Sequence, residues 1–352
     1  MTDSTASEEV QDTTAGDQEG SAYAASGAFE RDTRYITTRV SRDSDEYPVE
    51  ADRYRLVVAR ACPWANRMVI VRRVLGLEDA MSIAFCGPEH DERSWTFDLD
   101  PGGVDPVLGY ERLQQAYFAR FPDYPLGITV PALVDVPSRA VATNDFAQMT
   151  LDLGSEWVAF QREGAPDLYP EELRAEMDGV MAGIYTEVNN GVYRCGFAGD
   201  QAAYDDAYNR LFAHLDLLEE RLATRRFLMG DAITEADVRL WVTLVRFDAV
   251  YHGHFKCNRN KLTEMPVLWA YSRDLFQTPG FGDTIDFPQI KAHYYRVHRD
   301  LNPSGVIPGG PDLAGWLEPH GREKFGDQPF GDGTAPAPVR PDEAVPAGNG
   351  AV

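Results

Sequence analysis

Cysteine is scarce in this chain. The four cysteines among 352 residues stand far apart, at Cys62, Cys86, Cys195 and Cys257, and form no CxxC pair. A long chain with few scattered cysteines is not a disulfide scaffold, and structural zinc sites need closely spaced ligand pairs. We therefore expect free thiols, a cytoplasmic location and no bound metal. The stretch "HGHFKC", residues 252–257, has ligand-type side chains, but no second cluster is placed to complete a site.

Long apolar runs and an excess of positive charge are also missing. No run of about 18 apolar residues occurs, which argues against a transmembrane helix. The N-terminus lacks the basic and apolar regions of a secretory signal. Lys and Arg number 33 against 56 Asp and Glu, a net charge of -23. A general basic surface for nucleic acid or anionic membrane is thereby excluded, and we expect small-molecule partners.

Composition and periodicity divide the chain into four regions. Residues 1–28 are acidic and poor in large apolar side chains, which predicts disorder. Residues 29–160 alternate strands and helices, with a Gly/Pro-rich insertion at 87–127. Residues 161–320 have helical apolar spacing. Residues 321–352 are rich in Pro, Gly and Ala, which again predicts disorder.

The order of elements in the second region predicts an α/β thioredoxin-like layer. Strands are expected at 53–59, 80–86, 129–136 and 140–144, and helices from Pro63 to Gly76 and near 145–157. Pro131 inside a strand removes a ladder donor, and a cis Val130–Pro131 bond would explain it. In the all-α region, Thr234 and Asp237 predict a capped helix start. A thioredoxin-like domain followed by an all-helical domain is the glutathione-transferase fold.

Cys62 stands where the first strand passes into the first helix, in "VARACPWANRMVIVRR". At a helix N-terminus, backbone N–H groups and the helix dipole favour a thiolate, whereas a buried cysteine elsewhere packs as a small hydrophobe. Pro63 suits the first helical turn. Ala65 occupies the place of a second cysteine, so Cys62 must react with an external thiol through a mixed disulfide. We interpret Cys62 as a reactive monothiol.

From about residue 30 to 320 the chain resembles the glutathionyl-hydroquinone reductases, the Xi class of glutathione transferases. The family's "CPWAHR", "WTFD", "NNGVYKAGFA", "TEADIRLWTTLVRFDPVY…HFKC" and "HYYRSH…NPTGIIP.GP" are similar to five stretches in the same order. These stretches are 62–67, 95–98, 189–198, 234–251 with 254–257, and 293–298 with 302–311.

The resemblance implies a reductase that removes a thiol from a thiol-conjugated hydroquinone through a Cys62 mixed disulfide. It implies Tyr193 and Tyr294 as catalytic tyrosines, with Tyr295 adjacent in the substrate site. For the thiol co-substrate, glutathione or a similar small thiol, it implies contacts from Trp95, the backbone of Val130, Asn144 and Asp145. It also implies a homodimer.

The departures from the family pattern gather where the family holds glutathione. Ile128 replaces a frequent Arg, Asp145 and Phe146 replace the Glu and Ser of "NES", and Asn66 replaces a His. A site that has lost a cation and a hydroxyl matches the charged tripeptide poorly. We therefore predict another thiol, with the sugar-based mycothiol as a candidate.

Two other functions stay open from the residues. A general thiol transferase or dehydroascorbate-type reductase would also use Cys62. A non-enzymatic binding module on the same fold would not need the thiol.

Overall fold

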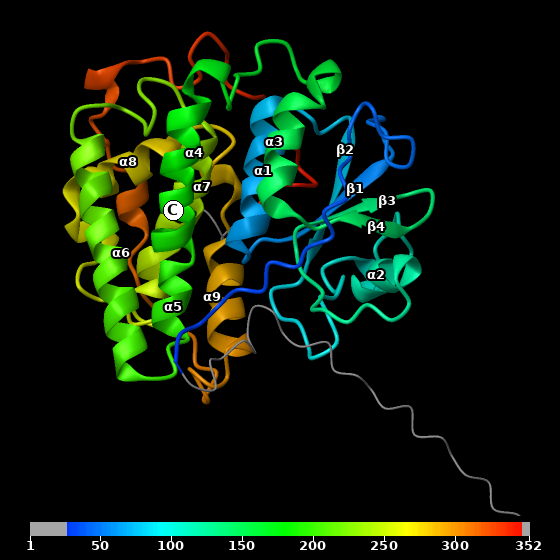
Figure 1. The fold of residues 1–352 in the computed structure, drawn as a ribbon, viewed down its shortest axis with the longest axis horizontal. Coiled ribbons are helices and arrows are strands. Elements are labelled where there is room, and N and C mark those ends of the chain that lie inside the picture. Colours follow the sequence, from blue (N-terminus) through cyan, green and yellow to red (C-terminus); the bar gives the residue numbers. More distant parts are fainter. Residues whose placement is uncertain (1–26, 347–352) are drawn as a thin grey trace, which may run out of the picture.

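The computed structural model describes residues 27–346, so the predicted acidic tail lies outside it except for its last two residues. Within it, a sheet domain and a helical domain pack side by side (Figure 1). None of the helices over residues 27–346 is long and apolar enough to cross a lipid bilayer.

The sheet domain is built on four strands in the order β2-β1-β3-β4. The strands are β1 (Tyr54–Ala59), β2 (Met81–Cys86), β3 (Ala132–Asp135) and β4 (Ala140–Thr143). β1 pairs parallel with β2 and antiparallel with β3, which pairs antiparallel with β4. All six residues of β1 are buried, as expected for a central strand covered on both faces. The Val130–Pro131 bond before β3 is cis, as predicted.

Three helices cover the sheet. They are α1 (Pro63–Leu75), α2 (Gln114–Arg120) and α3 (Phe146–Ser155). α1 contacts α3 in its own domain and α7 (Glu235–Leu244) in the other, whereas α2 packs against β4. Gly76 ends α1 with φ 69°, a left-handed conformation that glycine adopts without steric cost. α1 is therefore buried between the two domains, and Cys62 lies at its N-terminal end.

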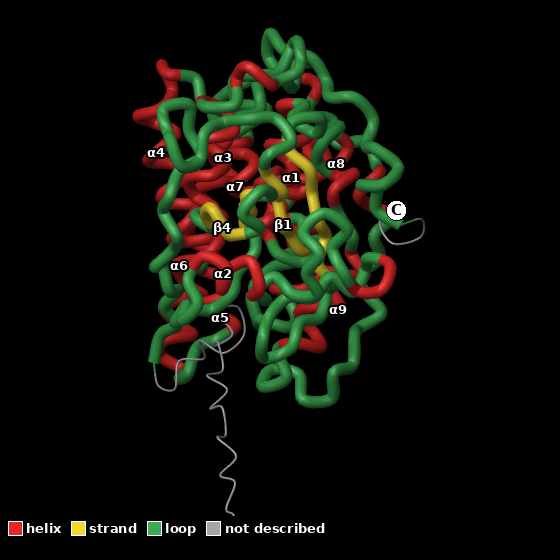
Figure 2. The backbone as a smooth tube through the Cα atoms, turned by 90° about the vertical axis from the view of Figure 1, so that its right-hand side faces the viewer, coloured by secondary structure: helices red, strands yellow, loops and turns green. Residues whose placement is uncertain are grey.

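The helical domain places α4 to α9 around one continuous apolar core. Besides α7, these are α4 (Arg174–Gly183), α5 (Gly191–Gly196), α6 (Gln201–Leu222), α8 (Pro266–Gln277) and α9 (Phe287–Val297). Turned by 90°, the few strands are surrounded by helices and long loops (Figure 2). The predicted cap of α7 is present: the backbone N–H and hydroxyl of Thr234 donate to Asp237 at 2.8 and 2.9 Å. The predicted fold class is confirmed.

The first described residues, 27–52, belong to neither domain's regular structure but join the two. The dark blue trace in Figure 1 runs from α5 across to the sheet domain. Phe29 packs on Phe197 beside α5, with ring centroids 5.6 Å apart. At the other end the Ile36 N–H donates to Asn144 Oδ1 at 2.7 Å, and the Thr143 hydroxyl donates to the Ile36 carbonyl at 2.7 Å. These contacts fix the segment over the junction between the domains.

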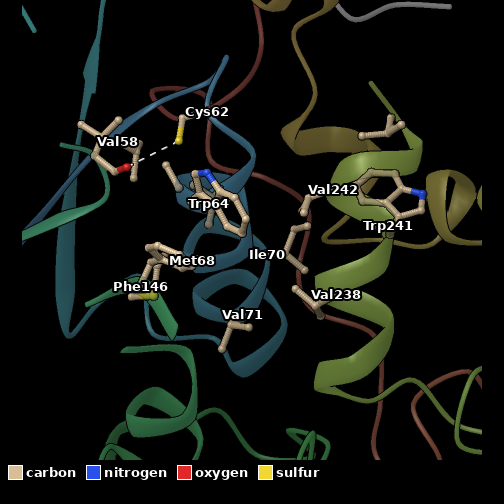
Figure 3. Packing of buried hydrophobic residues seen from close by; sticks show 14 of the residues in the cluster. Val58, Cys62, Trp64, Met68, Ile70, Val71, Phe146, Val238, Trp241 and Val242 are labelled. Atoms are coloured by element: carbon tan, nitrogen blue, oxygen red, sulfur yellow. Dashed lines mark hydrogen bonds between the residues drawn. The ribbon is translucent and has the colours of Figure 1, made fainter. Parts of the chain in front are cut away.

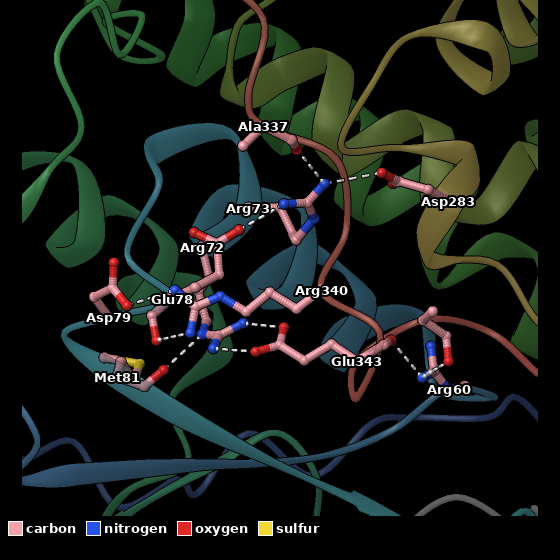
Figure 4. Close-up of polar contacts among 11 residues, drawn as sticks. Arg60, Arg72, Arg73, Glu78, Asp79, Met81, Asp283, Ala337, Arg340 and Glu343 are labelled. Carbon is pink, nitrogen blue, oxygen red and sulfur yellow. Dashed lines mark hydrogen bonds and ion pairs between the residues drawn. The ribbon is translucent and has the colours of Figure 1, made fainter.

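The structure corrects the prediction that residues 321–352 form a disordered tail. The Arg322 guanidinium donates to carbonyls of the helical domain, among them that of Arg226 at 2.7 Å, and residues 337–344 make polar contacts with α1 and its surroundings (Figure 4). Glu343 accepts two hydrogen bonds from the Arg72 guanidinium at 2.6 and 2.8 Å, and its carbonyl accepts from Arg60 at 2.7 Å. Compositional bias did not reveal this, because the contacts, such as the buried Glu343–Arg72 pair, join residues that are far apart in the sequence. The remainder, 347–352, lies outside the described residues.

Replacing Glu343 with Gln tests this attachment. The Arg72 side chain is fully buried and that of Glu343 is 9% exposed, so the variant leaves a buried guanidinium without its carboxylate. Loss of one partner of such a pair costs about 3–5 kcal/mol in the free energy of unfolding. Chemical denaturation measures the difference.

Asp79→Asn is the matched control, because it breaks an ion pair of the same tail, with Arg340, at a carboxylate that is 96% exposed. Its cost should stay below about 1 kcal/mol. An equally small decrease in the free energy of unfolding in both variants would show that the Glu343 contact does not hold the tail.

Candidate active site

Cys62 is the N-cap residue of α1. Its side chain is buried at the start of the helix, next to Trp64 (Figure 3). Sγ lies 3.4 Å from the carbonyl oxygen of Val130, the residue before the cis proline. The first N–H groups of a helix have no partner within the helix, and they carry the positive end of its dipole. The strand-to-helix position predicted from the sequence is confirmed.

The other cysteines are poor candidates for a nucleophile. All four cysteines are free and buried. Burial raises the pKa of Cys86 well above its usual value, and burial also raises that of Cys257, which lies beside Cys195. A buried thiol without a nearby positive charge stays protonated and inert. Position at a helix N-terminus therefore distinguishes Cys62 from Cys86 and Cys257.

Three tyrosine hydroxyls form a hydrogen-bonded chain in the helical domain. Tyr193 and Tyr294, both predicted from the sequence, lie 2.7 Å apart at their hydroxyl oxygens. The Tyr251 hydroxyl lies 3.0 Å from that of Tyr294. Burial raises the pKa of Tyr251 to about 12, so it stays a neutral hydroxyl at physiological pH. Such a chain can supply a proton or polarise a ring oxygen.

The tyrosine chain and Cys62 meet around the indole of Trp64, two residues after the cysteine. Trp64 packs on Tyr193 with ring centroids 6.4 Å apart and on Phe146 at 4.6 Å. The guanidinium of Arg67 lies 4.7 Å from the centre of the indole. Burial lowers the pKa of Arg67 to about 9, while negative charge on Glu235 and on Cys62 favours its charged form. A Cys62 thiolate and the Arg67 cation therefore stabilise each other.

The remaining predicted site residues lie in different surroundings. Trp95 stacks on His293 of α9, next to Tyr294, with centroids 5.2 Å apart and an interplanar angle of 17°. Tyr295 does not join the tyrosine chain, because its hydroxyl donates to the Ala249 carbonyl at 3.4 Å. Successive residues on a helix point about 100° apart, which separates Tyr294 from Tyr295.

Asn144 and Asp145 precede α3 at the edge of the same region. The Asn144 amide is engaged within the protein, accepting from the Ile36 N–H and donating to Thr129 Oγ1 at 2.9 Å. The structure therefore gives Asn144 a role in positioning the N-terminal segment. Asp145 is half-buried at the start of α3, and its contact with a co-substrate stays a prediction.

Asn66 has a structural role that the sequence did not reveal. Its Nδ2 donates to Thr284 Oγ1 at 2.8 Å, and its Oδ1 accepts from the Arg246 guanidinium at 3.2 Å. Both partners belong to the helical domain. Asn66 thus joins α1 to that domain, and it gives no support to a changed thiol preference.

Sequence reasoning missed two residues of this region. Tyr251 lies within a stretch that resembles the family, but a single tyrosine among many apolar residues gave no signal of a hydrogen-bonded chain. Arg31 lies in the segment before the first domain, and its guanidinium is 4.6 Å from the centre of the Tyr193 ring. Only its aromatic neighbours, which are distant in the sequence, reveal its place.

Comparisons with known proteins identify the fold and the family of this chain. Residues 201–274 match the family model of the glutathione S-transferase C-terminal domain. A glutathione transferase structure from Gordonia bronchialis is 68% identical, covers 90% of this chain and 99% of its own, and superposes with a TM-score of 0.89. The chain is thus a glutathione transferase by fold.

Two further comparisons identify the family of glutathione transferases to which the chain belongs. Glutathionyl-hydroquinone reductase YqjG of Escherichia coli is 39% identical over 312 residues, which is 85% of this chain and 94% of that protein. The structure of YqjG with bound glutathione has a TM-score of 0.75 and 40% identity, covering 79% of this chain and 90% of its own. The chain belongs to the glutathionyl-hydroquinone reductase family, which confirms the resemblance found in its motifs.

The buried side chain of His254 should make the stability of the protein depend on pH. Its ring packs on Tyr295 at 4.6 Å, and burial, with Lys256 and His293 nearby, lowers its pKa to about 4. An unfolded histidine has a pKa of about 6.5, so the unfolded state binds more protons between these values. This contribution to stability is fully present above about pH 6.5 and is lost as the pH falls towards 4, by on the order of 3 kcal/mol.

His254→Asn should therefore flatten the dependence of the free energy of unfolding on pH between about 6.5 and 4. Urea denaturation at a series of pH values measures it. His252→Asn, at a half-exposed position two residues earlier, is the control and should leave the slope unchanged. A slope that is the same in all three proteins would contradict the assignment.

Proposed function

We propose that this protein is a thiol-dependent reductase that removes a thiol group from thiol-conjugated hydroquinones. The proposal rests on one observation. Trp64, two residues after Cys62 at the start of α1, packs on Tyr193, the first member of the Tyr193–Tyr294–Tyr251 hydroxyl chain. A thiolate attacks sulfur, and hydroxyls beside an aromatic ring donate a proton. The site therefore combines the two groups that cleavage of an aromatic thioether requires.

The proposed reaction has two steps. The Cys62 thiolate forms a sulfur–sulfur bond with the conjugate, the carbon–sulfur bond breaks, and its electron pair passes to the ring, which takes up a proton from the tyrosine chain. A second thiol then attacks the mixed disulfide and releases a disulfide product and the Cys62 thiolate. In sum, one conjugate and one thiol give one hydroquinone and one disulfide.

Family membership supports glutathione as the thiol, since YqjG has a structure with glutathione bound. Two departures support mycothiol as a second candidate. Ile128 is buried where the family often has Arg, and Phe146 packs its ring between Trp64 and Tyr35, at 4.6 and 5.2 Å, where the family has Ser. An apolar surface at this end favours a thiol without carboxylates. The four free cysteines are consistent with work in a reducing compartment, and the homodimer stays a prediction.

Cys62→Ser is the first test. The variant should lose at least about 10³-fold in turnover of glutathionyl- and mycothiol-hydroquinones, because a serine hydroxyl is not ionised at neutral pH. Intact-mass measurement of the wild-type protein after incubation with each conjugate should show the thiol added to Cys62, and the preferred mass identifies the co-substrate. Cys195→Ser is the control.

Undiminished turnover in Cys62→Ser would indicate a binding module or a reaction that bypasses the thiol. Adduct formation from mixed disulfides or turnover of dehydroascorbate, with none from quinol conjugates, would favour a general thiol transferase. Turnover of the glutathionyl conjugate with no reaction of the mycothiol conjugate would refute the mycothiol candidate.

Tyr294→Phe tests the tyrosine chain, because Tyr294 bonds to both other hydroxyls. We expect kcat for the quinol conjugate to fall about 10²-fold or more, since proton donation to the ring is lost. Tyr295→Phe, the neighbour whose hydroxyl bonds only weakly to Ala249 at 3.4 Å, should keep kcat within a few-fold. Equal effects of the two variants would contradict the role of the chain.

A further inference from the structure

Two arginines flank the indole of Trp64, and two consecutive asparagines hold them. Arg67 donates from Nη2 to Asn189 Oδ1 at 2.6 Å, and Arg31 donates from Nε to Asn190 Oδ1 at 2.8 Å. Each guanidinium carbon lies 4.7 Å from the centre of the Trp64 ring. The asparagine pair therefore orients two cations beside the indole of Trp64.

Three N–H donors in this cluster have no acceptor among the described residues. They are Nη2 of Arg31, Nε1 of the Trp64 indole and Nε of Arg67, and all three atoms are buried. In Figure 3 the indole nitrogen lies on the edge of Trp64 nearer Cys62. A buried donor without a partner loses its hydration and gains nothing in return, by about 1–3 kcal/mol. Of the three, the donors of Arg31 and Trp64 lie on adjacent side chains and indicate a ligand that supplies oxygen acceptors.

Arg31 is the less buried cation of the pair, and it contacts the ring of Tyr193. Arg67 is fully buried among α1, Asn189 and the Arg239 carbonyl. Arg31 is half-buried and lies on the segment that spans the domain junction, within 4.6 Å of the centre of the Tyr193 ring. Its guanidinium thus reaches both the aromatic ring beside Cys62 and the tyrosine chain.

We propose that Arg31, together with the indole N–H of Trp64, binds an anionic oxygen of the reacting conjugate. The inference rests on the proposed function and adds a specificity residue from outside both domains. The oxygen belongs either to a carboxylate of the thiol group or to the ring oxygen of the hydroquinone. In either case a planar guanidinium with a free N–H forms a charge-assisted hydrogen bond that a neutral side chain does not replace.

Arg31→Gln and Arg31→Lys test the proposal in the full-length protein. The substrates are hydroquinone conjugated to glutathione, which carries carboxylates, and hydroquinone conjugated to 2-mercaptoethanol, which has none. We expect Arg31→Gln to lower kcat/KM roughly 10-fold to 100-fold for at least one conjugate, as for a lost charge-assisted hydrogen bond, with partial recovery in Arg31→Lys. Arg34→Gln, on the same segment with a 73% exposed side chain, is the matched control and should resemble the wild type.

The pattern of loss identifies the oxygen. Loss with the glutathionyl conjugate alone assigns the thiol carboxylate, and loss with both conjugates assigns the ring oxygen. A reaction that involves neither the carboxylate nor the ring oxygen shows whether the substitution merely disturbs the structure. Dithiothreitol should release 2-mercaptoethanol from its mixed disulfide with Cys62 at the same rate in Arg31→Gln as in the wild type.

Wild-type kinetics of Arg31→Gln with both conjugates would overturn the proposal, as would an equal slowing of the dithiothreitol reaction. Adduct formation on Cys62 in the wild-type protein tests the proposed function separately. If the wild-type protein forms the adduct and Arg31→Gln has wild-type kinetics, the proposed function stands and the proposal for Arg31 is wrong. A wild-type protein that forms no adduct overturns both.

Discussion

The guanidinium of Arg246 holds the reactive end of α1 against the helical domain. It is fully buried just beyond α7 and donates to the carbonyls of Arg60 and Ala61 at 2.9 and 3.0 Å, immediately before Cys62. It also donates to Asn66 in the first turn of α1 and to the Val242 carbonyl of α7. A buried cation needs its hydrogen bonds satisfied, so these contacts specify one arrangement of the two domains. The direction in which Cys62 faces depends on that arrangement.

The helical domain supplies the groups that surround the cysteine. Tyr193, Tyr251 and Tyr294 come from three different elements, and their hydroxyls meet only because α5, α9 and the π-helical segment 247–251 converge. Burial keeps the Tyr251 hydroxyl neutral at physiological pH, while a Cys62 thiolate and the Arg67 cation attract each other. Opposite protonation preferences therefore lie within one cluster, which a nucleophile and a proton donor acting on the same bond require.

Local signals predicted the parts of the site that depend on neighbouring residues. A strand followed by Cys62 and Pro63 indicated a helix N-terminus, Gly76 indicated the helix end, and Pro131 indicated the cis bond. The family motifs located Tyr193 and Tyr294. No local pattern distinguished Tyr294 from Tyr295, because their separation arises from helix geometry and from what packs on each face. Composition likewise gave no sign that Glu343 pairs with Arg72 of α1, because the two residues are far apart in the sequence.

The sequence by itself determined the class of fold, the position of the monothiol at the start of a helix, and the family. These follow from periodicity, from turn residues and from motifs that span neighbouring positions. Tertiary structure alone decided that Asn66 joins the domains, that Tyr251 completes the hydroxyl chain, and that Arg31 reaches Trp64. The physical reason is that hydrogen bonds and cation–aromatic contacts depend on distances of 3 to 5 Å between groups that are far apart in the chain.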